Sequence, residues 1–150
     1  MTKRIFKSML LVSMIVLFAG SGLIMGILYH YFGKQLAKEL KTEAAYLAIA
    51  VEKEGMEAFD RLPPQTERVT YIDEDGTVLF DSVADEDDMD NHENRSEIQK
   101  ALKTGSGTAV RKSDTLSEKT LYYAMKMADG KVLRVSSVQY NIPGLLGGMV

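Results

Sequence analysis

The chain begins with an almost unbroken run of apolar residues. From Met9 to Phe32 it has no Asp, Glu, Lys or Arg, and only Ser, Gly and one His interrupt the apolar side chains. At ~1.5 Å per helical residue, such a run is long enough to cross a hydrocarbon layer of ~30 Å. The pattern therefore predicts a transmembrane helix over residues 9–32.

Three cations, Lys3, Arg4 and Lys7, precede this run. A basic start followed by an apolar stretch is also typical of a secretory signal peptide, and residues 19–21 resemble its cleavage site. Cleavage there would leave a strongly apolar mature end, so we predict an uncleaved signal anchor instead. The positive-inside bias then predicts that residues 1–8 are cytoplasmic and that the chain beyond residue 32 lies outside the cell membrane.

Beyond the apolar run, smaller apolar residues recur at helical spacing. Steps of three and four separate Ala37, Leu40, Ala44, Leu47 and Val51, which predicts a long amphipathic helix running out of the membrane. This stripe has two interpretations: the seam of a parallel homodimer that transmits a signal, or a face packed on its own domain. The stripe is too short to assign a coiled coil, so both interpretations stay open.

From residue 69 onward the pattern alternates with a period of two. The predicted elements are, in order, a hairpin over 69–80, a helix over 94–104, a strand over 107–112 and a hairpin over 121–137. Asn94 and Glu97 have the spacing of a capping box at the start of the helix, and Gly105 ends it. The expected fold class is α+β: a transmembrane helix, a long amphipathic helix and a five-stranded antiparallel sheet.

The alternation also predicts which side chains form the core of this domain. The expected buried residues are Tyr71, Leu79, Phe80, Ile98, Leu102, Leu121, Tyr123, Val132 and Val135. From Ile142 to Val150 the chain is again uncharged, but this run is too short to span a bilayer. We interpret residues 141–150 as the start of a truncated second transmembrane helix, which leaves residues 33–140 as one extracytoplasmic domain.

Composition and charge narrow the function classes. The chain has 150 residues and no Cys, which fits a single domain and excludes a disulfide-stapled miniprotein. Through residue 41, six Lys and Arg face one Glu, whereas beyond it 12 cations face 20 carboxylates. An acidic body disfavours binding to phosphate backbones, so the expected partner is the lipid bilayer and not nucleic acid.

The acidic stretch 81–93 suggests calcium binding, but its spacing does not fit. Read as an EF-hand loop from Asp85 or from Asp88, it lacks the Gly at position six and the Glu at position twelve. His92 has no second His or Cys nearby to complete a zinc site. The chain also lacks the nucleophile-elbow and phosphate-binding glycine motifs. We therefore predict no metal site, no catalytic residues and no cofactor in this chain.

With metal, catalytic and cofactor sites set aside, the remaining candidate is a surface that binds a ligand. Arg111 and Ser113 lie where a predicted strand meets a loop, and Tyr122 lies on one face of the next strand. These side chains could reach an anionic or polar ligand, and ordinary surface packing is the alternative. His92, just before the predicted helix, and Arg95, at its start, complete the set of candidate ligand-binding residues.

Three segments carry a resemblance to a known family. They read DGTVLFDS (75–82), NHENRSEIQKAL (91–102) and RKSDTL (111–116). Together with the basic N-terminus and the membrane helix, they resemble the sensor region of bacterial sensor histidine kinases of the phosphate-regulation and cell-wall-regulation type. The resemblance implies a single Cache domain, which has a PAS-like fold, between two membrane helices, followed by a HAMP linker and a dimeric kinase core.

The resemblance implies the extracytoplasmic signal-input domain of a homodimeric two-component sensor kinase. ATP, Mg and the response regulator would be bound only by the missing kinase core, because nothing here matches the phosphoacceptor or ATP-binding boxes of the family. Ser96 stands where the family pattern has Pro, a tolerable change at a helix start. Three alternatives stay open: the same input module on a chemoreceptor, on a cyclic-nucleotide synthase, or an acidic metal-binding domain anchored to the membrane.

Overall fold

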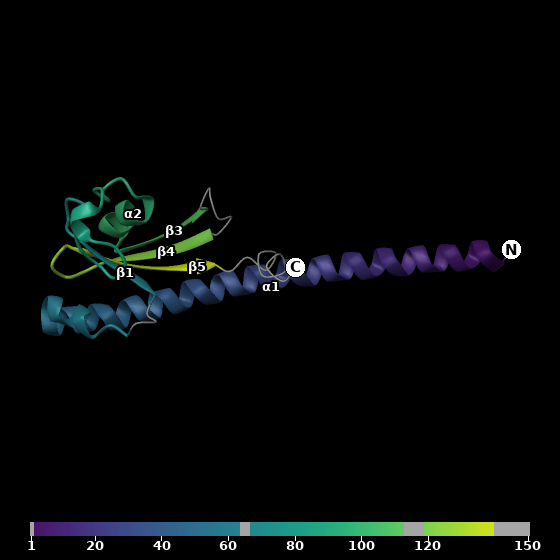
Figure 1. Cartoon of the computed structure of the whole chain (residues 1–150), viewed down its shortest axis with the longest axis horizontal. Helices are drawn as coiled ribbons and strands as arrows, with labels where there is room; N and C mark the ends of the chain where they lie inside the picture. Colours follow the sequence, from purple (N-terminus) through teal and green to yellow (C-terminus); the bar gives the residue numbers. More distant parts are fainter. Residues whose placement is uncertain (1, 64–66, 113–118, 140–150) are drawn as a thin grey trace. The chain divides into compact units, whose positions relative to one another are not determined.

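The computed structural model describes residues 2–63, 67–112 and 119–139. Its contacts divide the chain into two compact units, residues 1–35 and residues 36–150. The helix α1 (Thr2–Glu54) makes up the first unit and enters the second (Figure 1). The membrane helix and the amphipathic helix expected from the sequence are therefore parts of one helix.

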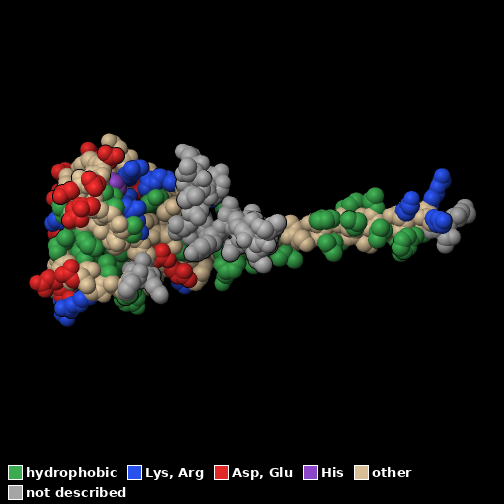
Figure 2. Space-filling view, viewed as in Figure 1, with side chains coloured by type: hydrophobic (Ala, Val, Ile, Leu, Met, Phe, Trp, Pro, Cys, Tyr) green, Lys and Arg blue, Asp and Glu red, His purple; other side chains and the backbone are tan. Residues whose placement is uncertain are grey.

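The first unit consists of the apolar start of α1. Every side chain from Lys3 to Phe32 is exposed, and Figure 2 shows apolar side chains along this stretch with Lys and Arg near its beginning. The stretch is long and apolar enough to cross a membrane. Exposing apolar surface to water costs ~25 cal/mol per Å², so this part of α1 suits a bilayer better than water.

The second unit contains a five-stranded sheet. Its strands are β1 (Arg68–Ile72), β2 (Val78–Asp81), β3 (Ser106–Lys112), β4 (Lys119–Lys126) and β5 (Val132–Gln139). They lie in the order β2-β1-β5-β4-β3, and each neighbouring pair is antiparallel. The predicted α+β fold class with a five-stranded antiparallel sheet is confirmed.

Two of the connections are tight turns that end in Asp-Gly. Gly76, between β1 and β2, has φ +87°, and Gly130, between β4 and β5, has φ +91°. These left-handed values are unfavourable for a residue with a Cβ atom, which explains the glycine at both positions. Both predicted hairpins are confirmed.

Helices cover the two faces of the sheet (Figure 1). On one face, α1 from Leu36 onward and the 3-10 helix η1 (Gly55–Arg61) pack against β1, β4 and β5. On the other face, α2 (Ser96–Thr104) places Ile98 and Ala101 against three small or branched side chains of the sheet. A further 3-10 turn, η2 (Glu86–Asp88), follows β2.

Most of the predicted core is buried. The buried residues of that set are Tyr71, Ile98, Leu121, Tyr123, Val132 and Val135. Leu79, Phe80 and Leu102 are only half-buried, so the prediction was wrong for these three. Leu79 and Phe80 lie on β2, an edge strand with a neighbouring strand on one side only. Leu102 packs beside the cluster that Ile98 and Ala101 form with the sheet.

The start of α2 also differs from the prediction. The helix begins at Ser96 with Arg95 as its N-cap residue, and Arg95 makes no capping hydrogen bond with its side chain. The capping box of Asn94 and Glu97 is therefore not formed. The Glu97 carboxylate binds the guanidinium of Arg111 on the sheet instead. Hydrogen bonds between charged groups are about twice as strong as those between neutral groups. The helix ends as predicted at Gly105, with φ +89°.

Candidate functional site

The face of the sheet below α2 is apolar in one part and charged in the next. Side chains alternate along a strand, so Val132 and Arg134 of β5 point to the same face. The register pairs Val132 with Ile72 and Arg134 with Thr70 on β1. Val132 and Ile72 contact α2, whereas Arg134 and Thr70 belong to a network of polar contacts.

Glu97 is the centre of this network. Glu97 is 0% exposed, and its carboxylate lies between the sheet and the first turn of α2. Arg111 of β3 donates from Nη1 to Oε2 at 3.1 Å and from Nη2 to Oε1. Arg134 Nη1 lies 3.6 Å from the same Oε1. One carboxylate thus joins α2 to β3 and β5.

The protonation state of Glu97 follows from these partners. Burial alone would raise the pKa of Glu97. The hydrogen bonds and charge of Arg111, together with the charge of Arg134, outweigh burial and hold this pKa below its usual range. Glu97 is therefore a carboxylate at neutral pH.

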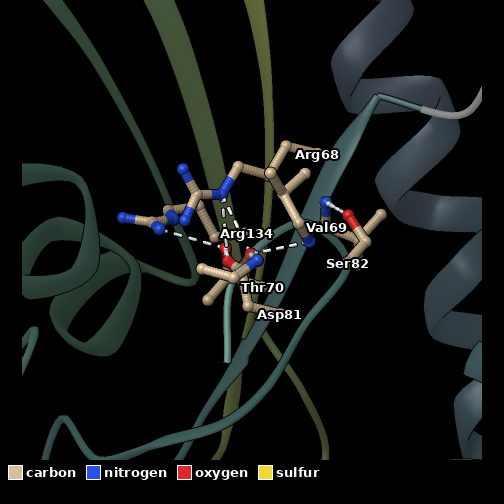
Figure 3. A network of polar contacts seen from close by, with 8 residues as sticks. Arg68, Val69, Thr70, Asp81, Ser82 and Arg134 are labelled. Carbon is tan, nitrogen blue, oxygen red and sulfur yellow. Dashed lines mark hydrogen bonds and ion pairs between the residues drawn. The ribbon is translucent and has the colours of Figure 1, made fainter. Parts of the chain in front are cut away.

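A second part of the network leads from Arg134 to β2 (Figure 3). Arg134 Nη2 donates to Thr70 Oγ1 at 3.0 Å, and Thr70 Oγ1 donates to Asp81 Oδ2 at 2.8 Å. Arg68 Nε donates to the Asp81 carboxylate at 3.1 Å. Burial raises the pKa of Asp81, but hydrogen bonds from the Ala84 backbone, Thr70 and Arg68 lower it further than burial raises it. Asp81 is ionised as well.

Arg134 is not fully satisfied by these contacts. It is 3% exposed, and its Nε has no hydrogen-bond partner in the part of the chain that the structure describes. The network also holds three guanidiniums, those of Arg68, Arg111 and Arg134, against the two carboxylates of Asp81 and Glu97. A buried donor and an excess positive charge are costly, and an anion would compensate both.

Tyr122 of β4 lies beneath the two arginines that contact Glu97. The Arg111 Cζ atom is 3.9 Å from the centroid of the Tyr122 ring, and the Arg134 Cζ atom is 5.3 Å from it. A guanidinium over an aromatic face is favourable and fixes the plane of the guanidinium. Arg111 and Tyr122, both candidates from the sequence, are thus brought together.

His92 is buried beside the same network. Its Nδ1 lies 2.6 Å from the backbone oxygen of Asp90, to which it donates. Burial, the positive charge of Arg134 and that of Arg95 lower the pKa of His92. Arg95 itself is exposed, and Ser113, the remaining candidate, lies outside the described residues. His92 is therefore a neutral neighbour of the arginines at neutral pH.

This position predicts a dependence of stability on pH. The unfolded chain protonates His92 near its ordinary pKa of 6.5, whereas the folded chain does so only at lower pH. Protons therefore favour the unfolded state, and the free energy of unfolding falls as the pH drops from 6.5 toward the folded pKa. Denaturant titrations between pH 7.5 and 5 measure this loss. His92→Gln should remove it and His30→Gln should retain it; equal slopes in both variants would contradict the assignment.

Four of the five residues of the stripe that could form a dimer seam pack into the domain interior. Leu40, Ala44 and Val51 are buried, and Leu47 is half-buried beside them. They pack against the sheet of their own chain. Of the two interpretations left open by the sequence, the structure shows these side chains packed on their own domain, and the homodimer stays a prediction.

The acidic stretch after β2 remains at the surface. Asp85 to Asp88 are exposed, and Figure 2 shows carboxylates on the surface of this unit. Within the described ranges, no three His, Cys, Asp or Glu side chains lie close enough to hold a metal ion. The stretch adds negative charge to the surface of the sheet domain.

Comparison with known proteins leaves the family open. No protein-family model and no curated protein matches the chain. The resemblance to sensor-kinase input domains therefore stays a prediction from the residues.

Proposed function

We propose that the chain is the membrane-anchored, extracytoplasmic signal-input domain of a bacterial two-component sensor histidine kinase. The single observation that carries this proposal is that one helix, α1, belongs both to the apolar segment and to the core of the sheet domain. Its apolar start suits a bilayer, and from Leu40 to Val51 the same helix supplies core residues of the sheet domain. A change in how the sheet packs would thus act on the helix that enters the membrane.

The central strand β5 connects the charged site to α1. Leu133 and Val135 point toward α1 and lie in its clusters, whereas Arg134 between them belongs to the polar network on the opposite face. A ligand or envelope state that favours one arrangement of the network would shift the population of α1 packings. The shift is limited by the difference in affinity for the two states.

In this proposal the protein is a homodimer, and its contact face lies on the exposed side of α1. Thr42, Ala45, Tyr46 and Ile49 are exposed and recur at helical spacing, and Tyr46 and Ile49 are 71% and 63% exposed. Two copies inserted in one membrane in the same orientation can align these faces in parallel. The buried residues of α1 then pack on the sheet of their own chain, and the exposed residues contact the second copy.

The proposal places residues 1–8 in the cytoplasm and the sheet domain outside. A HAMP linker and a kinase core would follow the second membrane helix and would bind ATP, Mg and the response regulator. A chemoreceptor or a cyclic-nucleotide synthase could carry the same input module, and only the output domain distinguishes these classes.

The test is a change of helix phase between the membrane segment and the domain. The chain is joined to the linker and core of a sensor kinase with a known output, and two residues are inserted after Phe32. The insertion rotates the two parts of α1 by about 200° relative to each other. We expect kinase output to change by severalfold while the domain stays folded. An insertion after Lys41 is unsuitable, because it would separate the buried residues Leu40 and Ala44.

The matched control is an insertion of seven residues at the same place. Seven residues nearly restore the helical phase, so output should return toward that of the parent. External protease should remove the sheet domain of all three proteins and spare an N-terminal tag. Unchanged output after the two-residue insertion, or a tag accessible from outside, would contradict the proposed function.

A further inference from the structure

We infer that Arg111 and Arg134 form a binding site for the carboxylate group of a small-molecule ligand, and that Glu97 occupies this site as an internal competitor. A ligand carboxylate would displace Glu97 and remove the charged attachment of the first turn of α2 to the sheet. The signalling consequence rests on the proposed function, whereas the binding step depends only on the site.

The first argument is the number of donors around Glu97. Arg111 uses two N–H groups on the carboxylate, in the paired geometry with which guanidiniums bind free carboxylates. Arg134 contributes only a contact of 3.6 Å from Nη1, and its Nε has no partner within the described residues. The two guanidiniums thus offer more donors than Glu97 satisfies, and a carboxylate placed freely between them could use them better.

The second argument is the charge of the surroundings. Among the residues that the structure describes, three guanidiniums face two carboxylates in this network, and His92 beside it is neutral. Tyr122 adds the negative face of its ring. A neutral or cationic ligand would leave the excess positive charge in place, so an anion is the complementary class.

The third argument is that the first turn of α2 has one charged attachment to the sheet, the Glu97 carboxylate. The helix α2 has nine residues, and its N-cap residue makes no side-chain hydrogen bond. Ile98, which is fully buried in the same turn, and Ala101 one turn later pack on the apolar part of the sheet. The Glu97 carboxylate is thus the charged attachment of the first turn, and its exchange would remove that attachment while Ile98 and Ala101 keep the helix on the sheet.

Solvent can reach the site from one side. The Arg111 side chain is 32% exposed, whereas that of Glu97 is fully buried. A ligand carboxylate can therefore approach the outer guanidinium first and replace the Glu97 oxygens on it. Glu97 would then move to solvent, where a carboxylate is well hydrated.

Binding of acetate to the full chain in detergent micelles tests this inference. Chloride at the same ionic strength is the control anion, and Glu97→Gln is the central variant because it keeps the shape of the side chain and removes its charge. We expect Glu97→Gln to bind acetate at least tenfold more tightly than the parent in calorimetric titrations. Arg111→Gln added to this variant should abolish binding, and Glu93→Gln, at an exposed carboxylate nearby, should bind as the parent does.

A second measurement needs no variant. In the parent protein, saturating acetate should increase amide hydrogen exchange in residues 97–100 at least threefold and leave β1 and β5 unchanged. Three results would overturn the inference: equal acetate affinity of the parent and Glu97→Gln, equal binding of chloride, or slower exchange in residues 97–100. Failure of the kinase-output test with these binding results intact would instead remove only the proposed function.

Discussion

Replacing Glu97 with Ala lowers the free energy of unfolding of the sheet domain by about 3 kcal/mol. The substitution leaves the guanidiniums of Arg111 and Arg134 without their shared carboxylate, and Arg134 is 3% exposed. Removing one partner of a buried ion pair typically costs about 3–5 kcal/mol, because an uncompensated charge remains in the interior. Arg111 is partly exposed, which places the expected loss at the lower end of that range.

Near-UV circular dichroism during urea titration measures this loss, since the sheet domain contains Tyr71, Tyr122 and Tyr123 and the chain has no Trp. The control is Glu93→Ala, which removes an exposed carboxylate close in sequence and should change the stability by less than about 0.5 kcal/mol. A similar small loss for Glu97→Ala would show that the arginines are adequately solvated without it.

Leu40→Ala is expected to cost about 2–5 kcal/mol, because it removes a fully buried side chain between α1 and the sheet and leaves a cavity. Ile49→Ala on the same helix is the matched control. Ile49 is 63% exposed, so its truncation should change the stability by less than about 0.5 kcal/mol. The same urea titrations compare the two variants. Equal losses at both positions would contradict the packing of α1 on the sheet.

The fold could be predicted from the sequence where local patterns determine it. The change of period from helical spacing to alternation separates α1 from the strands, and Asp-Gly marks both hairpin turns. The order of the strands could not be predicted in this way. The pairing of β1 with β5 joins residues far apart in sequence, and no local pattern encodes such a contact.

The site could be predicted only in part, for a similar reason. The sequence singles out Arg111 at a strand end and Tyr122 on one face of the next strand, and the structure places them together. Glu97 was assigned to a helix cap because its spacing from Asn94 fits one, yet its partner lies on a distant strand. Arg134 lies within an apolar strand, where alternation alone does not predict a polar partner. An arginine on the same face as Val132 was the signal that could have revealed a buried charge.

The position of β5 also determines when the domain can form during synthesis. β5 is the last described strand in the chain, yet it lies between β1 and β4 in the sheet. Until residues 132–139 have been made, β1–β2 and β3–β4 are two hairpins without the strand that joins them. Long-range pairing of this kind slows folding, because the intervening loop must close first. On the proposed topology, the apolar start of α1 therefore enters the bilayer before the sheet exists, and the domain assembles on a helix that is already anchored.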